Sequence, residues 1–143
     1  MKGIEVKQAE LYHKIAKCMD AWMGLREQEY SIGNYFQLHN IHKVGIYGYG
    51  ILGRHLVWEI EQMNESVEIE WILDKRAESI TNVKIPIYLP DLVDTISDVD
   101  VIIVCAIGDF AEIEAMLCQK TSVKVIPLDE IVRYCVNRLR KVQ

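Results

Sequence analysis

The fold is decided by the stretch Lys43-Val44-Gly45-Ile46-Tyr47-Gly48-Tyr49-Gly50-Ile51-Leu52-Gly53-Arg54-His55-Leu56, which is typical of a buried strand that passes through a glycine-rich turn into a helix. About twenty residues beyond Gly53, a second apolar run ends in Asp74. Each glycine has a physical role, since Gly48 permits the tight turn, Gly50 lets the backbone approach a pyrophosphate, and Gly53 lets the helix pack closely on the sheet. This spacing is the fingerprint of a dinucleotide-binding strand–helix–strand unit, and it indicates a binding fold more specifically than a reaction.

Length and composition narrow the class of protein. The 143 residues suit one domain with a sizeable core. Sixteen Lys and Arg against 21 Asp and Glu residues give a formal charge of −5, which argues against nucleic acid or an anionic membrane as a partner. No apolar run approaches the roughly 18 residues that span a bilayer, and the first residues lack a signal-peptide core. We therefore expect a cytoplasmic protein.

The four cysteines are widely separated and form no Cys-x-x-Cys pair, which argues against a zinc site or a disulfide framework. We expect reduced, mostly buried thiols at Cys18, Cys105, Cys118 and Cys135.

Residues 1–40 are expected to form an N-terminal helical extension, and residues 41–143 a nucleotide-binding domain. Over 6–25, apolar residues recur at helical spacing in two stripes, which make an unusually wide apolar face. That face either covers a sheet edge alone or is shared between the body and a second subunit, which would make the protein a homodimer through this helix. A short second helix is predicted between Ser31, as its cap, and Asn40, as its stop.

The rest of the chain alternates strands with helices and predicts an α/β fold. We expect a three-layer Rossmann-like parallel sheet of about five strands in the order 3-2-1-4-5, with right-handed crossovers. The apolar run 99–106 should be an interior strand, whereas Pro86 restricts the segment 83–88 to an edge because it cannot donate to a ladder. Helices are predicted over 90–96, from Asp109 through Leu117 with a cap at Asp109 and a return from Glu112, and over 128–139.

In a doubly wound sheet a ligand lies beyond the carboxyl ends of the strands at the switch point, which here falls between the first and fourth strands. The loops 48–53 and 106–109 would line that crevice. The N–H groups that open the helix at Ile51 would face it with the positive end of the helix dipole, which suits a phosphate. Alternatively, the glycines only permit the turn and the packing. The candidate binding residues are Gly48, Tyr49, Gly50, Ile51, Leu52, Gly53, Asp74, Lys75, Arg76, Ala106 and Ile107.

Asp74 at the end of the second strand could accept hydrogen bonds from ribose hydroxyls, which would favour NAD over NADP, or it could be a solvated strand end. Lys75 and Arg76 could hold a phosphate or be solvated turn residues. Only about eight residues separate Asp74 from the next extended segment, whereas a helical crossover needs a dozen or more. A loop is therefore expected where the adenine is usually sheltered, which leaves NAD or NADP, a shorter nucleotide, and no ligand as open alternatives.

No complete catalytic set is apparent. Cys105 lies near the crevice, but no His or acid is placed by the sequence to activate it, so we expect a packing role. His55 follows the glycine turn and could reach a phosphate or lie exposed; His13, His39 and His42 suggest no metal site. We expect a binding domain with no catalytic residue and no metal. An enzyme subunit completed by a partner and a degenerate scaffold for protein interaction are the alternatives.

Four segments of the chain together resemble the N-terminal nucleotide- or CoA-binding-like domains of bacterial sugar acyltransferases and of nucleotide-sugar dehydratases in surface-polysaccharide synthesis. They are residues 44–54, 71–74, 85–88 and 100–104. The resemblance implies a nucleotide-sugar or CoA as alternatives to NAD or NADP, and it assigns nucleotide-sugar binding to Gly48, Tyr49, Gly50 and Asp74. The chain has no hexapeptide repeats and no epimerase-type Tyr-x-x-x-Lys, so those activities are not implied. It also resembles potassium-channel regulatory domains in its glycine turn and strand-ending Asp, although their acidic segment is not visible.

Overall fold

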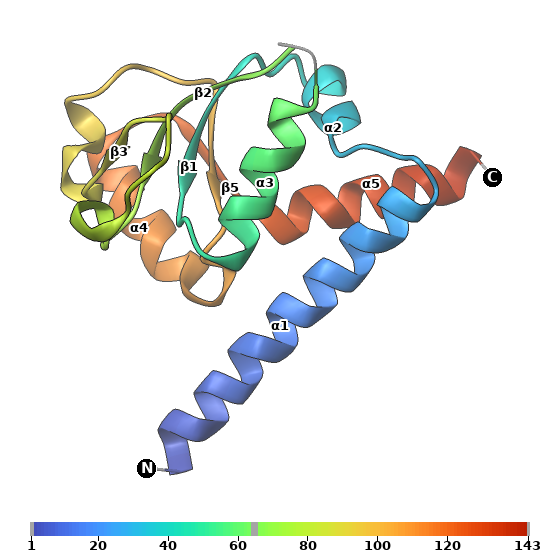
Figure 1. Cartoon of the computed structure of the whole chain (residues 1–143), viewed down its shortest axis with the longest axis horizontal. Coiled ribbons are helices and arrows are strands. Elements are labelled where there is room, and N and C mark those ends of the chain that lie inside the picture. Colours follow the sequence, from blue (N-terminus) through green and yellow to red (C-terminus); the bar gives the residue numbers. More distant parts are fainter. Residues whose placement is uncertain (1, 64–65, 143) are drawn as a thin grey trace.

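The computed structural model describes residues 2–63 and 66–142 of the chain. Within these residues it shows a five-stranded parallel sheet with helices on both faces and a long N-terminal helix that projects away from the body (Figure 1). The strand order is β3-β2-β1-β4-β5. The predicted α/β Rossmann-like fold and the 3-2-1-4-5 order are therefore confirmed.

The strands are β1 (Lys43–Tyr47), β2 (Glu68–Leu73), β3 (Ile87–Tyr88), β4 (Val101–Val104) and β5 (Lys124–Pro127). The α-helices are α1 (Lys2–Glu27), α2 (Gly33–Leu38), α3 (Ile51–Glu61), α4 (Phe110–Lys120) and α5 (Leu128–Val142). Three short 3₁₀ turns are η1 (Ala77–Ser79), η2 (Pro90–Asp94) and η3 (Ile107–Asp109). Among the described residues, no helix has the length and apolar character needed to cross a membrane.

Burial explains why the strands take these places. Every residue of β4 is buried, as are the last four of β1, because helices cover both faces of the middle of the sheet. At the edge, β3 contains only two residues and follows Pro86, whose carbonyl accepts a hydrogen bond from the Ile72 N–H at 2.9 Å. The run 99–106 contains the interior strand β4, which is shorter than that run, and the segment beside Pro86 lies at an edge, so both predicted positions in the sheet are confirmed.

The glycine turn joins β1 to α3 at the carboxyl edge of the sheet. Gly48 has a φ of +99°, a left-handed conformation that side chains rarely adopt, and its N–H donates to the Leu73 carbonyl at 2.8 Å. A Cβ atom at Gly53 would collide with the Gly48 carbonyl oxygen, so α3 can approach the sheet only because residue 53 has no side chain.

The two N-terminal helices join the core of the sheet domain. Cys18, Trp22 and Leu25 of α1 and Phe36 of α2 are buried in one cluster with residues of the sheet, α3 and α5. The division of the chain at residue 40 stays a prediction. The N-terminal half of α1 leaves the body, and Figure 1 shows its first turns extending beyond the other elements.

A buried carboxylate ties α1 to α3. Glu59 is 2% exposed; its Oε1 accepts hydrogen bonds from Trp22 Nε1 at 2.9 Å and Arg26 Nη1 at 3.2 Å. Its Oε2 accepts from the Ile32 N–H at 2.9 Å and from the Ser31 hydroxyl at 3.3 Å. Glu59 therefore fixes the direction in which α1 runs relative to α3.

Three local predictions differ in part from the structure. Asp109 is the N-cap of α4, as predicted, but its side chain makes no capping hydrogen bond, and η3 leads directly into the helix. The helix predicted over 90–96 is the 3₁₀ turn η2, which is only five residues long. Ser31 is not the N-cap of α2, a position held by Ile32, although its Oγ accepts the Gly33 N–H at 3.0 Å.

Candidate functional site

A cavity of about 850 Å³ opens at the carboxyl edge of the sheet. It lies beside the ends of β1 and β4, which is the switch point of the strand order and the place where open α/β sheets bind ligands. Its volume falls within the range of small-molecule sites. Of the candidate binding residues, all but two line it: Gly48, Gly50, Ile51, Leu52, Asp74, Lys75, Arg76, Ala106 and Ile107 do so, whereas Tyr49 and Gly53 lie outside the lining.

The amino end of α3 forms one wall of the cavity. Gly50 is the N-cap, without a side-chain capping hydrogen bond, and the first turn contains no acidic residue. The first N–H groups of a helix have no partner within it and carry the positive end of its dipole. A Cβ atom at Gly50 would meet no atom within 4 Å, so the backbone is open at this point. This wall can accept a phosphate without first losing a protein contact.

Asp74 braces the glycine turn. It is 6% exposed, and its Oδ2 accepts the Tyr49 N–H at 2.8 Å while Oδ1 accepts the Arg76 N–H at 2.7 Å. Burial by itself would raise the pKa of Asp74, but these N–H groups and the Arg76 guanidinium outweigh burial and lower it. Both carboxylate oxygens are thus engaged by the protein, a role that the sequence did not indicate. The predicted contact with ribose hydroxyls stays a prediction.

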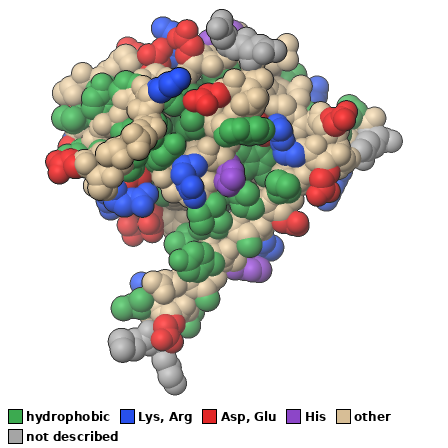
Figure 2. Space-filling model, in the orientation of Figure 1, with side chains coloured by type: hydrophobic (Ala, Val, Ile, Leu, Met, Phe, Trp, Pro, Cys, Tyr) green, Lys and Arg blue, Asp and Glu red, His purple; other side chains and the backbone are tan. Residues whose placement is uncertain are grey.

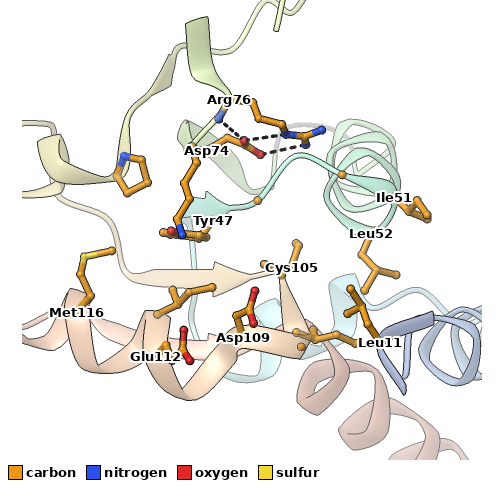
Figure 3. A pocket seen from close by; sticks show the side chains of 18 of the residues that line it. Leu11, Tyr47, Ile51, Leu52, Asp74, Arg76, Cys105, Asp109, Glu112 and Met116 are labelled. Carbon is orange, nitrogen blue, oxygen red and sulfur yellow. Dashed lines mark hydrogen bonds and ion pairs between the residues drawn. The ribbon is translucent and has the colours of Figure 1, made fainter. Parts of the chain in front are cut away.

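Arg76 stands beside Asp74 at the edge of the cavity (Figure 3). Its Nε lies 3.3 Å from Asp74 Oδ1, yet 63% of its side chain is exposed. A guanidinium carries five N–H donors, so this ion pair leaves donors of Arg76 free to bind an anionic group. Lys75 also lines the cavity and is exposed. The cavity therefore has positive charge beside the glycine turn.

The opposite wall is acidic. Asp109 and Glu112 come from η3 and α4, and Asp91 from η2; Figure 3 shows Asp109 and Glu112 across the cavity from Asp74. Between the walls lies Tyr47, which is 4% exposed. Burial, followed by the charges of Asp74, Asp109 and Asp91, raises the pKa of Tyr47. Its hydroxyl stays protonated at neutral pH. Asp109 belongs to the loop 106–109, which was expected to line the crevice, whereas Asp91 and Glu112 were not anticipated. Asp91 closely follows a predicted extended segment, which could have suggested it.

The cysteines and histidines add no reactive group to the cavity. Cys105 lines it, but burial raises the pKa of the thiol, which stays protonated and packs as expected. Cys18 and Cys135 are buried too, whereas Cys118 is exposed. His55 is exposed on α3 and makes an edge contact with Trp22 rather than lining the cavity. In the described part of the chain, no group of three or more His, Cys, Asp or Glu residues could hold a metal ion.

No protein-family model matches the chain, and a search of curated proteins finds no significant match. Among solved structures it is similar to the crystal structure of an engineered D-amino acid dehydrogenase bound to NADP⁺, with 27% sequence identity and a TM-score of 0.50. The fold is of the Rossmann-like, nucleotide-binding type. The alignment covers 61% of this chain and 27% of the dehydrogenase, so the chain matches about a quarter of that enzyme.

This Rossmann-like domain has a shortened crossover between β2 and β3. Residues 75–86, between Asp74 and Ile87, contain the three-residue turn η1 and no α-helix, so the loop predicted there is confirmed. The strand that follows begins at Ile87 rather than at Val83, the predicted start of the extended segment. Leu89 and Pro90, which follow β3, instead line the cavity at the side where a crossover helix is missing. Asp91, the next residue along the chain, lines the cavity beside them.

Proposed function

We propose that the chain binds a nucleotide, with a phosphate at the amino end of α3. The observation that carries this proposal is the open backbone at Gly50 on the wall of a large cavity at the sheet's switch point. The NADP⁺ in the similar dehydrogenase structure supports the same class of ligand. Because the sequence offers no complete catalytic set, we propose binding without catalysis by this chain alone.

Arg76 and Lys75 favour a nucleotide with a phosphate beyond the one at α3, such as the 2′-phosphate of NADP. The Asp74 oxygens, which could have bound a ribose 2′-hydroxyl, already accept N–H groups of Tyr49 and Arg76. The Arg76 guanidinium is mostly exposed beside the cavity and suits a phosphate. Among the nicotinamide cofactors, we therefore place NADP ahead of NAD, the reverse of the order expected from Asp74 alone.

A nucleotide-sugar is the second candidate, and the acidic wall favours it. Asp91, Asp109 and Glu112 present acceptors that could bind the hydroxyl groups of a sugar. This candidate agrees with the resemblance to proteins of surface-polysaccharide synthesis, and the link to that pathway remains a proposal. CoA as a ligand is a proposal as well. The cytoplasmic location is likewise proposed and can be tested by cell fractionation.

The test is a thermal-shift panel followed by calorimetric titration, with NAD⁺, NADP⁺, ADP, CoA and UDP-glucose as probes. A ligand present at 100 times its dissociation constant should stabilise the folded chain by about 2.7 kcal/mol. No change in melting temperature with any probe at millimolar concentration would refute nucleotide binding.

Gly50→Val should abolish the thermal shift and leave the melting temperature of the free protein nearly unchanged. A Cβ atom at this position would meet no atom within 4 Å, and we expect the branched side chain to cover the N–H groups that a phosphate would need. The matched control is Gly24→Val, since a Cβ atom at Gly24 would also meet no atom within 4 Å, and Gly24 does not line the cavity. If Gly50→Val binds as well as the parent protein, the phosphate does not bind at this turn.

We also propose a homodimer through α1. Ile4, Val6 and Tyr12 on its projecting half are 55–63% exposed, and Figure 2 shows hydrophobic side chains along this part of the molecule. Burial of such side chains against a second copy would stabilise association.

A further inference from the structure

The N-terminal helix lines one end of the cavity. Leu11 and Ile15 of α1 line the cavity together with Ile107 and Gly108 of η3. A methyl group at Gly108 would lie 2.6 Å from Leu11 Cδ1, so α1 packs directly against the backbone that follows β4. Figure 3 shows Leu11 near Leu52 and Cys105, at the end of the cavity away from Met116.

This position matters because of the path that a dinucleotide takes. In an open α/β sheet a dinucleotide crosses the switch point, and its two nucleotides lie on opposite sides of it. Here the switch point is between β1 and β4. From the glycine turn, the cavity continues toward η2 and α4, where Leu89, Pro90 and Met116 line it. On the other side of the turn it reaches α1.

The helix is held firmly in this place. One turn beyond Ile15, Cys18 is buried, and so are Trp22 and Leu25 farther along α1. Glu59 fastens Trp22 and Arg26 to α3 through hydrogen bonds of 2.9 and 3.2 Å. Moving α1 away from the cavity would break these contacts, so the helix keeps Ile15 and the 38% exposed Leu11 beside the cavity.

We infer that α1 limits the ligand to one nucleotide unit, because Leu11 and Ile15 occupy the side of the switch point that the second nucleotide of NAD or NADP would need. The inference rests on the proposed nucleotide binding and adds the length of the ligand. The adenosine half of a dinucleotide fits between the glycine turn and η2, and the nicotinamide half does not fit. Leu11 is the specificity-determining residue that the structure assigns.

The test compares whole cofactors with their halves by calorimetric titration. The pairs are NADP⁺ with adenosine 2′,5′-bisphosphate, and NAD⁺ with ADP. In at least one of these pairs, the parent protein should bind the mononucleotide at least about tenfold more tightly than the dinucleotide. Leu11→Ala should increase the affinity for the dinucleotide several-fold and leave the affinity for the mononucleotide within about twofold of the parent value. The substitution removes side-chain atoms only at the end of the cavity that α1 lines.

Ile15→Ala serves as a second variant at the end that α1 lines and should act in the same direction. His13→Ala is the matched control: His13 is exposed on the same helix, does not line the cavity and is not one of the side chains of the proposed dimer contact, so neither affinity should change. Melting temperatures of all variants show that they are folded.

The outcomes separate this inference from the proposed function. If the parent protein binds a whole cofactor as tightly as its half, or if neither Leu11→Ala nor Ile15→Ala improves binding of the whole, the length limit is overturned while nucleotide binding stands. If neither halves nor whole cofactors bind the parent protein or the variants, nucleotide binding itself is refuted, and the length limit is overturned with it.

Discussion

At the scale of single residues, Asp74 shows how one buried carboxylate can brace a candidate site through hydrogen bonds to the backbone. It joins the end of β2 to the glycine turn through Tyr49 and to the following loop through Arg76. The sequence placed Asp74 correctly at the end of a strand, beside the turn. Its partners are backbone N–H groups, which every residue except proline has, so no sequence pattern could show that they already satisfy the carboxylate.

Asp74→Asn should destabilise the protein by about 1–3 kcal/mol at pH 7, because an amide cannot accept both N–H groups as a carboxylate does. The pKa of Asp74 is lowered from its ordinary value of 3.8. Its contribution is therefore complete above pH 3.8 and is lost as the pH falls through the lower, folded-state pKa. The stability difference between parent and variant in urea titrations should shrink over that interval. If the parent and the variant differ in stability by the same amount at pH 7 and below the folded-state pKa of Asp74, this role is contradicted.

The matched control for Asp74 is Asp100→Asn at the opposite edge of the sheet. Asp100 accepts the N–H groups of His42 and Lys43 at 2.8 and 2.9 Å, which lower its pKa. It too should lose its stabilising effect in acid. Only the Asp74 variant should also weaken nucleotide binding, because only Asp74 holds the glycine turn.

At the scale of helices and strands, periodicity predicted most of the fold, because each element alternates or repeats its apolar residues according to the face that it buries. The apolar run over 99–106 indicated an interior strand, and Pro86 indicated an edge strand. Glu59 was not anticipated. It is a charged residue on α3, and its partners Trp22, Arg26 and Ile32 lie 27 to 37 residues away in the chain. Only the tertiary structure brings them together.

Glu59→Gln should loosen α1 and destabilise the fold by about 1–3 kcal/mol, because an amide leaves donors around it without a matching acceptor. Amide hydrogen exchange should become faster in the C-terminal half of α1, which Glu59 anchors, than in β4. Glu61→Gln is the control, since Glu61 is an exposed residue of the same helix. Unchanged exchange in α1 of the Glu59 variant would show that the apolar contacts alone hold this helix.

At the scale of the whole molecule, the cavity was predictable in place but not in shape. The strand order put the site between β1 and β4, and the glycine turn put a phosphate-ready helix end there. The position of Leu11 at the cavity was not predictable, because the apolar stripe of α1 does not say which of its turns meets the body and which meets the cavity. The acidic wall likewise depends on how η2 and η3 pack against α4.

The proposed dimer belongs to this scale. Sedimentation velocity should show a dimer at tens of micromolar, and Val6→Glu combined with Tyr12→Glu should shift the protein to a monomer by burying charge in the interface. Asp20→Ala, which changes an exposed residue of α1 closer to the body, is the control. A parent protein that sediments as a monomer over the whole range of concentration would contradict the dimer.

The continuity of α1 joins the two ends of the molecule. One unbroken helix of 26 residues has its projecting turns at one end, Leu11 and Ile15 at the cavity, and buried side chains at the other end. A partner bound to the projecting turns and a ligand bound in the cavity would therefore contact the same helix. Coupling between two binding sites is reciprocal. If a partner on α1 changes the affinity for the nucleotide by some factor, the nucleotide must change the affinity for that partner by the same factor.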